Sequence, residues 1–371
     1  MRIAHVITRM DRGGSAINTL VTATEQAESG ETVMLLCGAS RESNMSPQES
    51  RAVEEGVSRF VDVGGVVVVV AELYRAIGWA DVVALRQLRA RLRKFHPDVV
   101  HTHTSKSGVL GRLAALRLGA RVVHTPHGHV FHGYFSPLKT RLFIWLERVL
   151  AHATTSLIAL TRAERDDHLQ LHIGRSGQWH VVPSGVAVES IAERVTHLRS
   201  TGEQQPLHAI SVGRLTPIKG MDRLLYAWCE VVKREPQAQL TIVGDGELRD
   251  ELIAQSSQLG VATSVHFAGW DDPVPWLAKG DRFILLSRNE GMGRAVVEAF
   301  AAGLPCIVAD VCGLAELVDG SVGAVVDGDD ASAVATAVIA SYDCQAALQR
   351  RAQLYSVAAM VTAIGRIYES D

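Results

Sequence analysis

The sequence predicts an α/β protein of two doubly wound domains, each built on a parallel sheet with helices on both faces. Three observations support this fold class. The length of 371 residues is about twice that of an ordinary domain. Apolar runs of strand length alternate with longer helical patterns, as in consecutive βαβ units. A composition of 47% hydrophobic and 21% charged residues is that of a compact globular protein.

The strands of the first half are indicated by continuous Val, Ile and Leu runs, which are typical of buried parallel strands. They are RIAHVIT (2–8), TVMLLCG (32–38), DVVHTH (98–103) and RVVHTP (121–126). Helical patterns at 79–95 and 108–119 lie between them.

The same alternation restarts in the second half. Its expected strands are HAISVGRL (208–215), AQLTIVGDG (238–246), SVHFAGW (264–270), RFILLSR (282–288), PCIVAD (305–310) and GAVVDG (323–328). The segments 181–190 and 200–206 mark a boundary, so we expect an N-terminal domain over 1–183 and a C-terminal domain over 184–355. Ligands of parallel sheets bind at the carboxyl ends of the strands, so the two domains are expected to face a cleft.

Charge and cysteine usage narrow the class of protein. Residues 1–183 hold 22 Lys and Arg against 16 Asp and Glu, and the remainder holds 15 against 24, which sums to the net charge of −3. The charge difference could mean that the two halves bind different partners, or it could have no functional consequence; both interpretations stay open.

The five cysteines form no CxxC pair or zinc spacing, which favours reduced thiols in a cytoplasmic protein. The N-terminus reads as a first strand and not a signal peptide, and the apolar run at 66–71 is too short to span a bilayer.

Two glycine-containing turns could approach a phosphate. Gly13 and Gly14 precede a helix after the first strand, and Gly244 and Asp245 open the turn GDG after another strand. Neither has the GxGxxG spacing of a dinucleotide site. Each turn alone is weak evidence, and an ordinary βα turn is the alternative.

A pair of cations is more specific. Arg214 and Lys219 follow a strand in VGRLTPIKGMDRLL (212–225), with Pro217 stiffening the loop. At the end of a parallel strand, two such cations could hold a diphosphate and stabilise it as it departs. Unrelated surface cations are the alternative.

Six histidines fall between residues 101 and 132: His101, His103, His124, His127, His129 and His132. The first two should project to one face of a strand end. A zinc site is disfavoured because no carboxylate or cysteine ligand joins them, so we expect them to line a polar cleft. Pro126 and Gly128 flank His127 and suggest that this side chain is held in a defined place.

Two glutamates, Glu290 and Glu298, stand eight positions apart in SRNEGMGRAVVEAFAAG (287–303). On one straight helix they would be about 12 Å apart and on different faces. A glycosidase pair needs roughly 5–9.5 Å. With Glu290 on a loop and Glu298 on a helix, the two carboxylates can instead accept hydrogen bonds from different hydroxyls of one ligand. The amides of Gly291, Met292 and Gly293 at the helix start could meet phosphate or sugar oxygens. For Glu298 alone, a solvated first-turn glutamate is the alternative.

Taken together, these segments resemble the family 4 retaining glycosyltransferases of the GT-B fold. The similarity covers essentially the whole chain and looks like the subgroup that builds bacterial surface polysaccharides. The segments that carry it are RGGSAINTL, DVVHTHTSKSGVLGRLAA, HTPHG, GRLTPIKG, VGDGELRDEL, VHFAGW and SRNEGMGRAVVEAFAAGLPCIVADVCGLAELV.

The resemblance implies a role for each site residue. Glu290 and His127 would contact the sugar of a nucleotide-sugar donor and act in catalysis, and Glu298 would bind its ribose. Arg214 and Lys219 would bind the diphosphate. It further implies retention at the sugar, no cofactor and no required metal, and a C-terminal helix (356–371) that packs back on the N-terminal domain. That domain would bind the acceptor, and the C-terminal domain the donor, whose phosphates would also approach the glycine loop at Gly14.

Three departures from the family pattern affect local loops. Ser184 and Ala187 replace two polar residues of the usual P-N-G-V-D, the strand before Ser287 ends in LLS instead of L-P-S, and Ala315 stands where proline is common. They leave the donor ligands named above in place, and they put loop geometry and catalytic rate in question.

The expected partners are therefore a nucleotide sugar, most simply a UDP-sugar, and a glycan or lipid-linked acceptor, with no nucleic acid. A second hypothesis places the protein at an anionic membrane surface, because residues 134–150 mix Phe, Trp, Lys and Arg in an amphipathic pattern. An amphipathic helix packed on the sheet is the alternative. Two other functions stay open: a nucleotide-sugar epimerase, or a donor-binding protein without catalysis.

Overall fold

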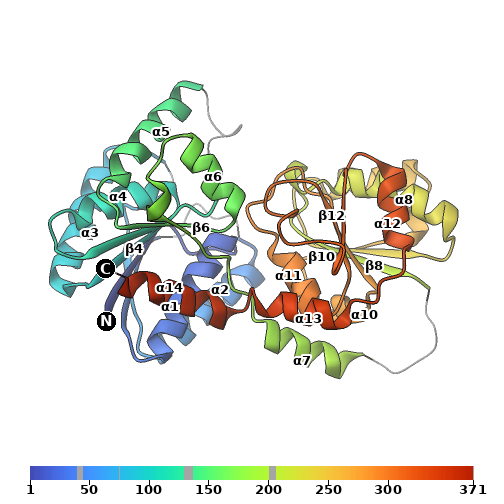
Figure 1. The fold of residues 1–371 in the computed structure, drawn as a ribbon, viewed down its shortest axis with the longest axis horizontal. Coiled ribbons are helices and arrows are strands. Elements are labelled where there is room, and N and C mark those ends of the chain that lie inside the picture. The colour runs from blue at the N-terminus through green and yellow to red at the C-terminus, as the bar shows by residue number, and fades with distance from the viewer. Residues whose placement is uncertain (40–44, 75, 129–136, 200–205, 371) are drawn as a thin grey trace. The chain divides into compact units, whose positions relative to one another are not determined.

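The chain forms two units, each with its own sheet and core (Figure 1). The computed structural model describes residues 1–39, 45–74, 76–128, 137–199 and 206–370. The first unit contains Met1–Gly185 together with the segment from Val357 onward, and the second contains Val186–Ser356. The C-terminal segment thus belongs with the N-terminal unit.

The first unit contains a seven-stranded parallel sheet in the order β3-β2-β1-β4-β5-β6-β7. Its strands are β1 (Arg2–Ile7), β2 (Thr32–Gly38), β3 (Val66–Val70), β4 (Val99–His103), β5 (Arg121–Thr125), β6 (Ser156–Ala159) and β7 (Trp179–Val181). β3, β6 and β7 were not predicted from the sequence. β6 and β7 are only four and three residues long, and four of the five residues of β3 are exposed or half-buried.

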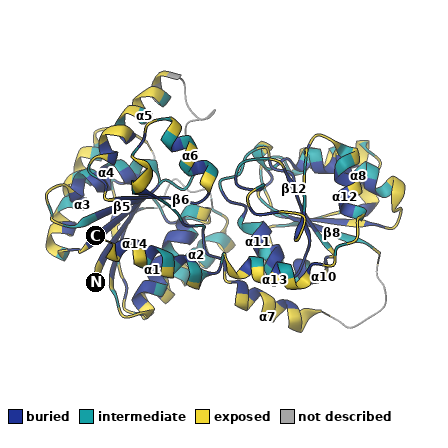
Figure 2. Ribbon diagram, viewed as in Figure 1, coloured by how far each residue is buried: buried dark blue, intermediate teal, exposed yellow. Residues whose placement is uncertain are grey.

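Helices cover both faces of this sheet. Leu88 of α3 and Leu110 of α4 pack on one face, whereas Ala23 of α1, Phe60 of α2 and Ile364 of α14 belong to the clusters on the other. The helices are α1 (Gly14–Glu28), α2 (Pro47–Asp62), α3 (Ala80–Phe95), α4 (Ser105–Ala115), α5 (Pro137–Ala151), α6 (Arg162–Gln170) and α14 (Val357–Glu369). Figure 2 shows the sheet as the buried layer between them.

The second unit repeats this plan with six parallel strands in the order β10-β9-β8-β11-β12-β13. The strands are β8 (His208–Val212), β9 (Gln239–Val243), β10 (Val265–Gly269), β11 (Arg282–Leu285), β12 (Cys306–Ala309) and β13 (Gly323–Val326). The helices are α7 (Val188–Leu198), α8 (Met221–Arg234), α9 (Arg249–Gln258), α10 (Pro273–Lys279), α11 (Arg294–Ala301), α12 (Ala331–Ile339) and α13 (Gln345–Gln353). Its core surrounds Trp228 of α8, which is fully buried.

Both sheets reverse their strand order once. The chain runs from β1 outward to β3 and then crosses to β4, and it runs from β8 to β10 and then crosses to β11. The carboxyl ends of β1 and β4, and of β8 and β11, are therefore the topological switch points where ligands of such sheets bind. The prediction of two doubly wound domains is confirmed. Within the described ranges, no helix is both long and apolar enough to cross a bilayer.

Candidate functional site

The switch point of the second unit holds an ion pair between Lys219 and Glu290. Lys219 ends a short 3₁₀ turn after β8 (Pro217–Lys219), and Glu290 lies in the loop between β11 and α11. The Lys219 Nζ and Glu290 Oε2 atoms are 2.5 Å apart, and the Ser287 hydroxyl donates to the same oxygen at 3.3 Å. The side chains are 24% and 14% exposed, so a ligand can reach a charge pair that is only partly shielded from water.

Backbone packing brings these two loops together. Gly220 has a φ of 65°, and a Cβ atom there would lie 2.0 Å from the Leu286 carbonyl oxygen. Only glycine allows that approach. The Arg288 amide donates to the Ile218 carbonyl at 2.8 Å, and the Arg288 guanidinium pairs with Asp222 at 2.5 Å. The guanidinium lowers the pKa of the Asp222 carboxyl. Sequence reasoning missed this second clamp, because its partners lie 66 positions apart.

Arg214, the other predicted cation, does not join the pair. It is exposed, and within the part of the chain that the structure describes its side chain has no hydrogen-bond or ion-pair partner. Of the two cations predicted to clamp a diphosphate, one is therefore paired with a predicted sugar-binding carboxylate, and the other is available to an anionic ligand.

The GDG turn packs against the same loop. Gly244 has a φ of 141°, and a Cβ atom there would be 2.0 Å from the Gly213 carbonyl oxygen. The Asp245 carbonyl accepts the Leu215 amide at 2.9 Å, and its exposed carboxylate accepts the Gly246 amide at 2.7 Å. The glycines in this turn thus allow the backbone to pack closely against the loop before Lys219.

The GMG segment joins the loop of Glu290 to α11. Met292 is buried, and Gly293 precedes the helix, where a Cβ atom would lie 2.4 Å from Leu314 Cδ2. Glu298 lies within α11, one turn after Arg294. Burial lowers the pKa of the Arg294 guanidinium, and the nearby Glu298 carboxylate opposes that shift. Glu290 and Glu298 thus occupy a loop and a helix, respectively.

The glycine turn at the first switch point is already occupied by a side chain. α1 begins at Gly14, and the Gly13 amide donates to the Asp11 carboxylate at 2.8 Å. Asp11 in turn pairs with Arg9 at 2.6 Å. An anionic phosphate that reached the Gly13 amide would have to displace this carboxylate.

His127 follows β5 in a left-handed conformation with a φ of 60°, which is uncommon outside glycine. Its Nε2 atom is 2.9 Å from His103 Nδ1, and its Nδ1 atom is buried without a partner among the described residues. Burial lowers the pKa of His127 to about 3. The Glu164 carboxylate holds the loop, since it accepts the amides of Gly128 and Leu160, each at 2.7 Å. Burial raises the pKa of Glu164 to about 7.

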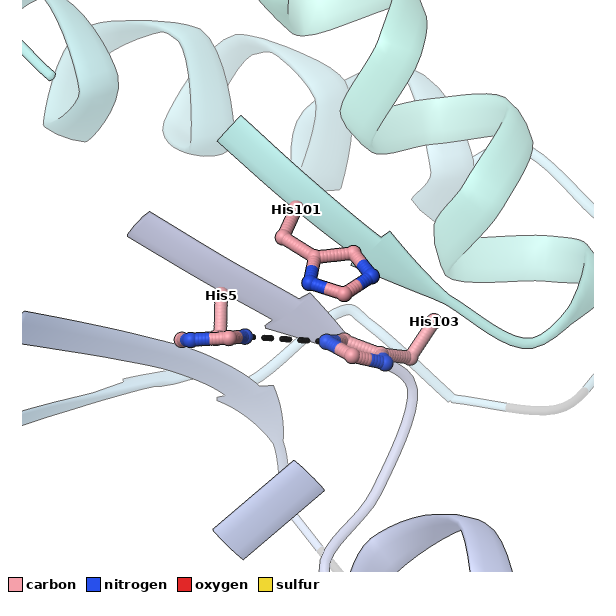
Figure 3. Close-up of side chains that lie close together, drawn as sticks. All are labelled: His5, His101 and His103. Atoms are coloured by element: carbon pink, nitrogen blue, oxygen red, sulfur yellow. Dashed lines mark hydrogen bonds between the residues drawn. The ribbon is translucent and has the colours of Figure 1, made fainter. Parts of the chain in front are cut away.

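His5, His101 and His103 form a buried cluster (Figure 3). His5 of β1 stands opposite His101 of β4, so the predicted pair gains a third histidine that sequence reasoning missed. The register of β1 against β4 is the signal that would have revealed it. Burial holds the pKa of His101 and His103 well below the ordinary value and lowers that of His5 to about 4.

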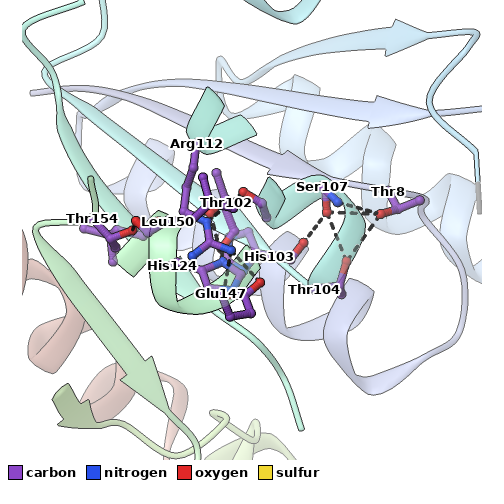
Figure 4. A network of polar contacts seen from close by, with 12 residues as sticks. Thr8, Thr102, His103, Thr104, Ser107, Arg112, His124, Glu147, Leu150 and Thr154 are labelled. Carbon is purple, nitrogen blue, oxygen red and sulfur yellow. Dashed lines mark hydrogen bonds and ion pairs between the residues drawn. The ribbon is translucent and has the colours of Figure 1, made fainter. Parts of the chain in front are cut away.

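His124 lies apart from this cluster. Its Nδ1 atom is 2.9 Å from the Thr102 hydroxyl, and its ring packs against Gly108 of α4, where a Cβ atom would be 2.4 Å from His124 Cε1. Beside it, a buried pair joins Arg112 to Glu147 at 2.6 and 2.8 Å and ties α4 to α5 (Figure 4). The predicted histidines 129 and 132 lie outside the described residues.

Comparisons with known proteins agree with the fold. Residues 13–185 match the family model described as "Glycosyl transferase 4-like domain", and residues 206–343 match "Glycosyl transferases group 1". D-inositol 3-phosphate glycosyltransferase of Actinosynnema mirum is 31% identical over 340 residues, which are 86% of this chain and 81% of that protein. UDP-Gal:alpha-D-GlcNAc-diphosphoundecaprenol alpha-1,3-galactosyltransferase of Escherichia coli is 32% identical over 247 residues, and the match spans 63% of each chain.

Solved structures show the same architecture. HepE of Anabaena, crystallised in complex with UDP, matches with a TM-score of 0.78 and 20% identity over 99% of both chains. The fold and the family models together define a glycosyltransferase with two doubly wound units. The chain belongs to the GT-B glycosyltransferase family of these models, as its motifs indicated.

Proposed function

We propose that this protein is a retaining glycosyltransferase that moves a sugar from a UDP-sugar to a hydroxyl of a glycan or lipid-linked acceptor during cytoplasmic polysaccharide or glycoconjugate synthesis. The observation that carries the proposal is the Lys219–Glu290 ion pair at the switch point of the second unit, with Arg214 exposed on the same loop. The family supports the reaction class. The galactosyltransferase relative is named for UDP-Gal and a diphosphoundecaprenol acceptor, and HepE was solved with UDP.

In this proposal the second unit binds the donor and the first unit binds the acceptor. Arg214 approaches the donor diphosphate, and Lys219 turns part of its charge from Glu290 to the same group. Cations fixed where negative charge develops lower the barrier to departure of the leaving group without a proton donor or a metal. Glu290, released from part of its ion pair, accepts a hydrogen bond from the sugar. Glu298 accepts from the ribose hydroxyls. The acceptor hydroxyl attacks the face from which the diphosphate leaves, and its proton passes to the departing diphosphate oxygen as the bond from that oxygen to the sugar breaks.

Donor binding tests the role of the ion pair. UDP-sugars are expected to raise the melting temperature of the chain, because a ligand that binds only the folded state stabilises it. K219A should remove most of that shift. The matched control is K233A, since Lys233 forms an exposed pair with Glu230 at 2.6 Å on α8. A K219A protein that keeps both the shift and full transfer activity would exclude the proposed site.

The stereochemistry of transfer needs a separate measurement. Proton NMR of the product formed with a UDP-α-sugar distinguishes an α-linked from a β-linked sugar. Retention predicts the α product alone. Conversion of the donor to an isomeric UDP-sugar without any acceptor would favour the epimerase alternative instead, and binding of the donor without any product would favour the non-catalytic one.

We also propose that the first unit attaches peripherally to an anionic membrane through α5. Leu142, Trp145 and Val149 are 55%, 57% and 49% exposed along one side of this helix, with Leu138 one turn before them. The neighbouring Arg141 and Arg148 are exposed as well. An apolar stripe flanked by cations is typical of a helix that lies in a membrane interface.

Vesicle flotation tests this attachment. W145S should weaken binding to vesicles that contain phosphatidylglycerol and leave solution activity on a soluble acceptor unchanged. Y226S is the control, because Tyr226 is 58% exposed on α8 of the other unit. Equal flotation of the wild type, W145S and Y226S would reject α5 as the contact.

A further inference from the structure

A buried chain of hydrogen bonds leads from α1 to His127. The Gln26 Oε1 atom lies 2.8 Å from His5 Nε2, and His5 Nδ1 lies 2.9 Å from His103 Nε2. His103 Nδ1 then lies 2.9 Å from His127 Nε2. Gln26, His5 and His103 are each at most 4% exposed, so water does not compete for these bonds.

The first acceptor sets the direction of every bond in this chain. An amide oxygen only accepts, so His5 must donate from Nε2. A neutral imidazole has one N–H group, so His5 Nδ1 accepts from His103 Nε2, and His103 Nδ1 accepts from His127 Nε2. Burial lowers the pKa of all three rings and keeps them neutral. His127 therefore carries its proton on Nε2 and a lone pair on Nδ1.

Tyr368 of α14 sets the orientation of the Gln26 amide. With its oxygen on His5, the Gln26 amide has only its NH₂ group left for the side-chain hydrogen bond with Tyr368, a bond that opposes the rise in the Tyr368 pKa caused by burial. The Tyr368 hydroxyl can then donate to His101 Nδ1, 2.6 Å away. His101 Nε2 then donates to the Thr125 hydroxyl at 2.8 Å. If every bond were reversed, His127 would instead bear an N–H group on Nδ1, where the described residues offer no acceptor. Buried donors without a partner are rarer and costlier than unused lone pairs.

The same histidines could be considered as a metal site, since nitrogen atoms of His5, His101 and His103 lie within 4.8 Å of one another. Their hydrogen bonds argue against it. Both ring nitrogens of His101 are hydrogen-bonded, one to Tyr368 and the other to Thr125. His5 Nδ1 and His103 Nε2 are hydrogen-bonded to each other, so a proton lies between two atoms that would have to bind the ion. A metal needs the lone pairs that these bonds occupy.

We infer that Gln26 and Tyr368 are positioning residues that fix the tautomer of His127 through His5 and His103, so that His127 presents only an acceptor, Nδ1, to its ligand. The inference rests on the proposed function for the reaction, and on the family resemblance for the ligand of His127, the sugar of the donor. The group that meets Nδ1 must then be a hydrogen-bond donor such as a hydroxyl. A carboxylate at that position, as in a uronic acid, is disfavoured.

Histidine NMR tests the tautomer without using activity. In the full chain labelled with ¹⁵N-histidine, the His127 ring, assigned by its loss in H127Q, should show a protonated Nε2 and an unprotonated Nδ1 at neutral pH. Q26L removes the first acceptor, and Y368F removes the hydroxyl that orients the amide. Each should give His127 a population protonated on Nδ1. Q26E restores an acceptor oxygen and should restore the single tautomer.

Controls and kinetics complete the test. T24V removes a partly buried bond on the same helix, from Thr24 to the Leu20 carbonyl, and should leave the His127 signals unchanged. With a UDP-sugar donor, Q26L should lower kcat about tenfold, the factor that one hydrogen bond is worth, and Q26E should recover most of it. Unchanged His127 signals in both Q26L and Y368F, or one equivalent of zinc in the purified chain, would overturn the inference. Altered signals with unchanged kcat would support the tautomer control and reject only the proposed role of His127.

Discussion

The two switch points of this protein have the same topology and opposite chemistry. At the carboxyl ends of β8 and β11, Lys219 and Glu290 form a charged pair that solvent partly reaches. Within β1 and at the end of β4, His5 and His103 are buried, neutral and bonded to each other. The comparison shows that the fold determines where a ligand site lies, whereas the side chains at the strand ends determine what chemistry it offers. A charged pair can exchange partners with an anion, and a neutral chain can hold one ring in one tautomer.

The largest expected effect that follows from this difference is an acid sensitivity that is stronger in the first unit than in the second. Burial lowers the pKa of His5 to about 4 and holds that of His101, His103 and His124 well below 6.5. The unfolded chain binds these protons below pH 6.5 and the folded chain does not. Stability is therefore fully present above pH 6.5 and is lost as the pH falls towards 4, by about 1.4 kcal/mol per pH unit for each histidine.

Hydrogen exchange at a series of pH values measures this effect. Peptides from β1 and β4 should lose protection between pH 6.5 and 4.5 before peptides from β9 and β12 do. In the second unit, burial lowers the pKa of His208, which is only half-buried, so we expect a smaller change there. H5Q should reduce the pH slope of the first unit by about one proton. Equal slopes for the two units would contradict the prediction.

The sequence predicted elements with strong apolar patterns better than contacts between distant loops. All six strands of the second sheet were predicted, and β3, β6 and β7 of the first were not. The positions of Glu290 on a loop and Glu298 on a helix follow from Gly293 and Gly303, which mark the start and the end of that helix in the sequence. The pairing of Glu290 with Lys219 does not, because it joins residues 71 positions apart. In the sequence, His5 is a single polar residue in an apolar strand. Its histidine neighbours become visible only when the register of β1 against β4 is known.

The second largest effect concerns function and not stability. E290Q keeps the shape of the side chain and removes its charge, so we expect transfer activity to fall about 100-fold, as when one preorganised electrostatic contact is lost. The free energy of unfolding should change by less than about 1 kcal/mol, because partly exposed ion pairs contribute little. Steady-state kinetics and urea unfolding on the same preparation measure both quantities.

A double-mutant cycle gives this prediction its control. If Lys219 and Glu290 act on one ligand as a unit, E290Q combined with K219M should be little slower than either single variant. Activity losses that multiply would show that the two side chains act independently. If the free energy of unfolding of E290Q fell by several kcal/mol, the ion pair would instead have a structural role.

A smaller effect is expected at Glu164, which supports the His127 loop. E164Q replaces one carboxylate oxygen by an NH₂ group that cannot accept the amide of Gly128 or Leu160. The unmet amide should cost about 1–3 kcal/mol at pH 7. Because burial raises the pKa of Glu164 to about 7, its contribution to stability is fully present below pH 4.5 and is lost as the pH rises to 7. Denaturant unfolding from pH 5 to 8 should therefore show one fewer proton bound on folding in E164Q than in the wild type.

The smallest effect is expected at the clamp between Arg288 and Asp222. Both side chains are more than a third exposed, so the pair should contribute under about 1 kcal/mol to folding. R288M removes the charge but leaves the Arg288 backbone amide bonded to Ile218, so the loop of Lys219 should stay in place. We expect an unchanged KM for the donor and a kcat within about threefold of wild type, which corresponds to under about 0.7 kcal/mol. Because Arg288 lies two residues from Glu290, a loss as large as that of E290Q would mean that loop position, and not the charge of Glu290, determines the rate.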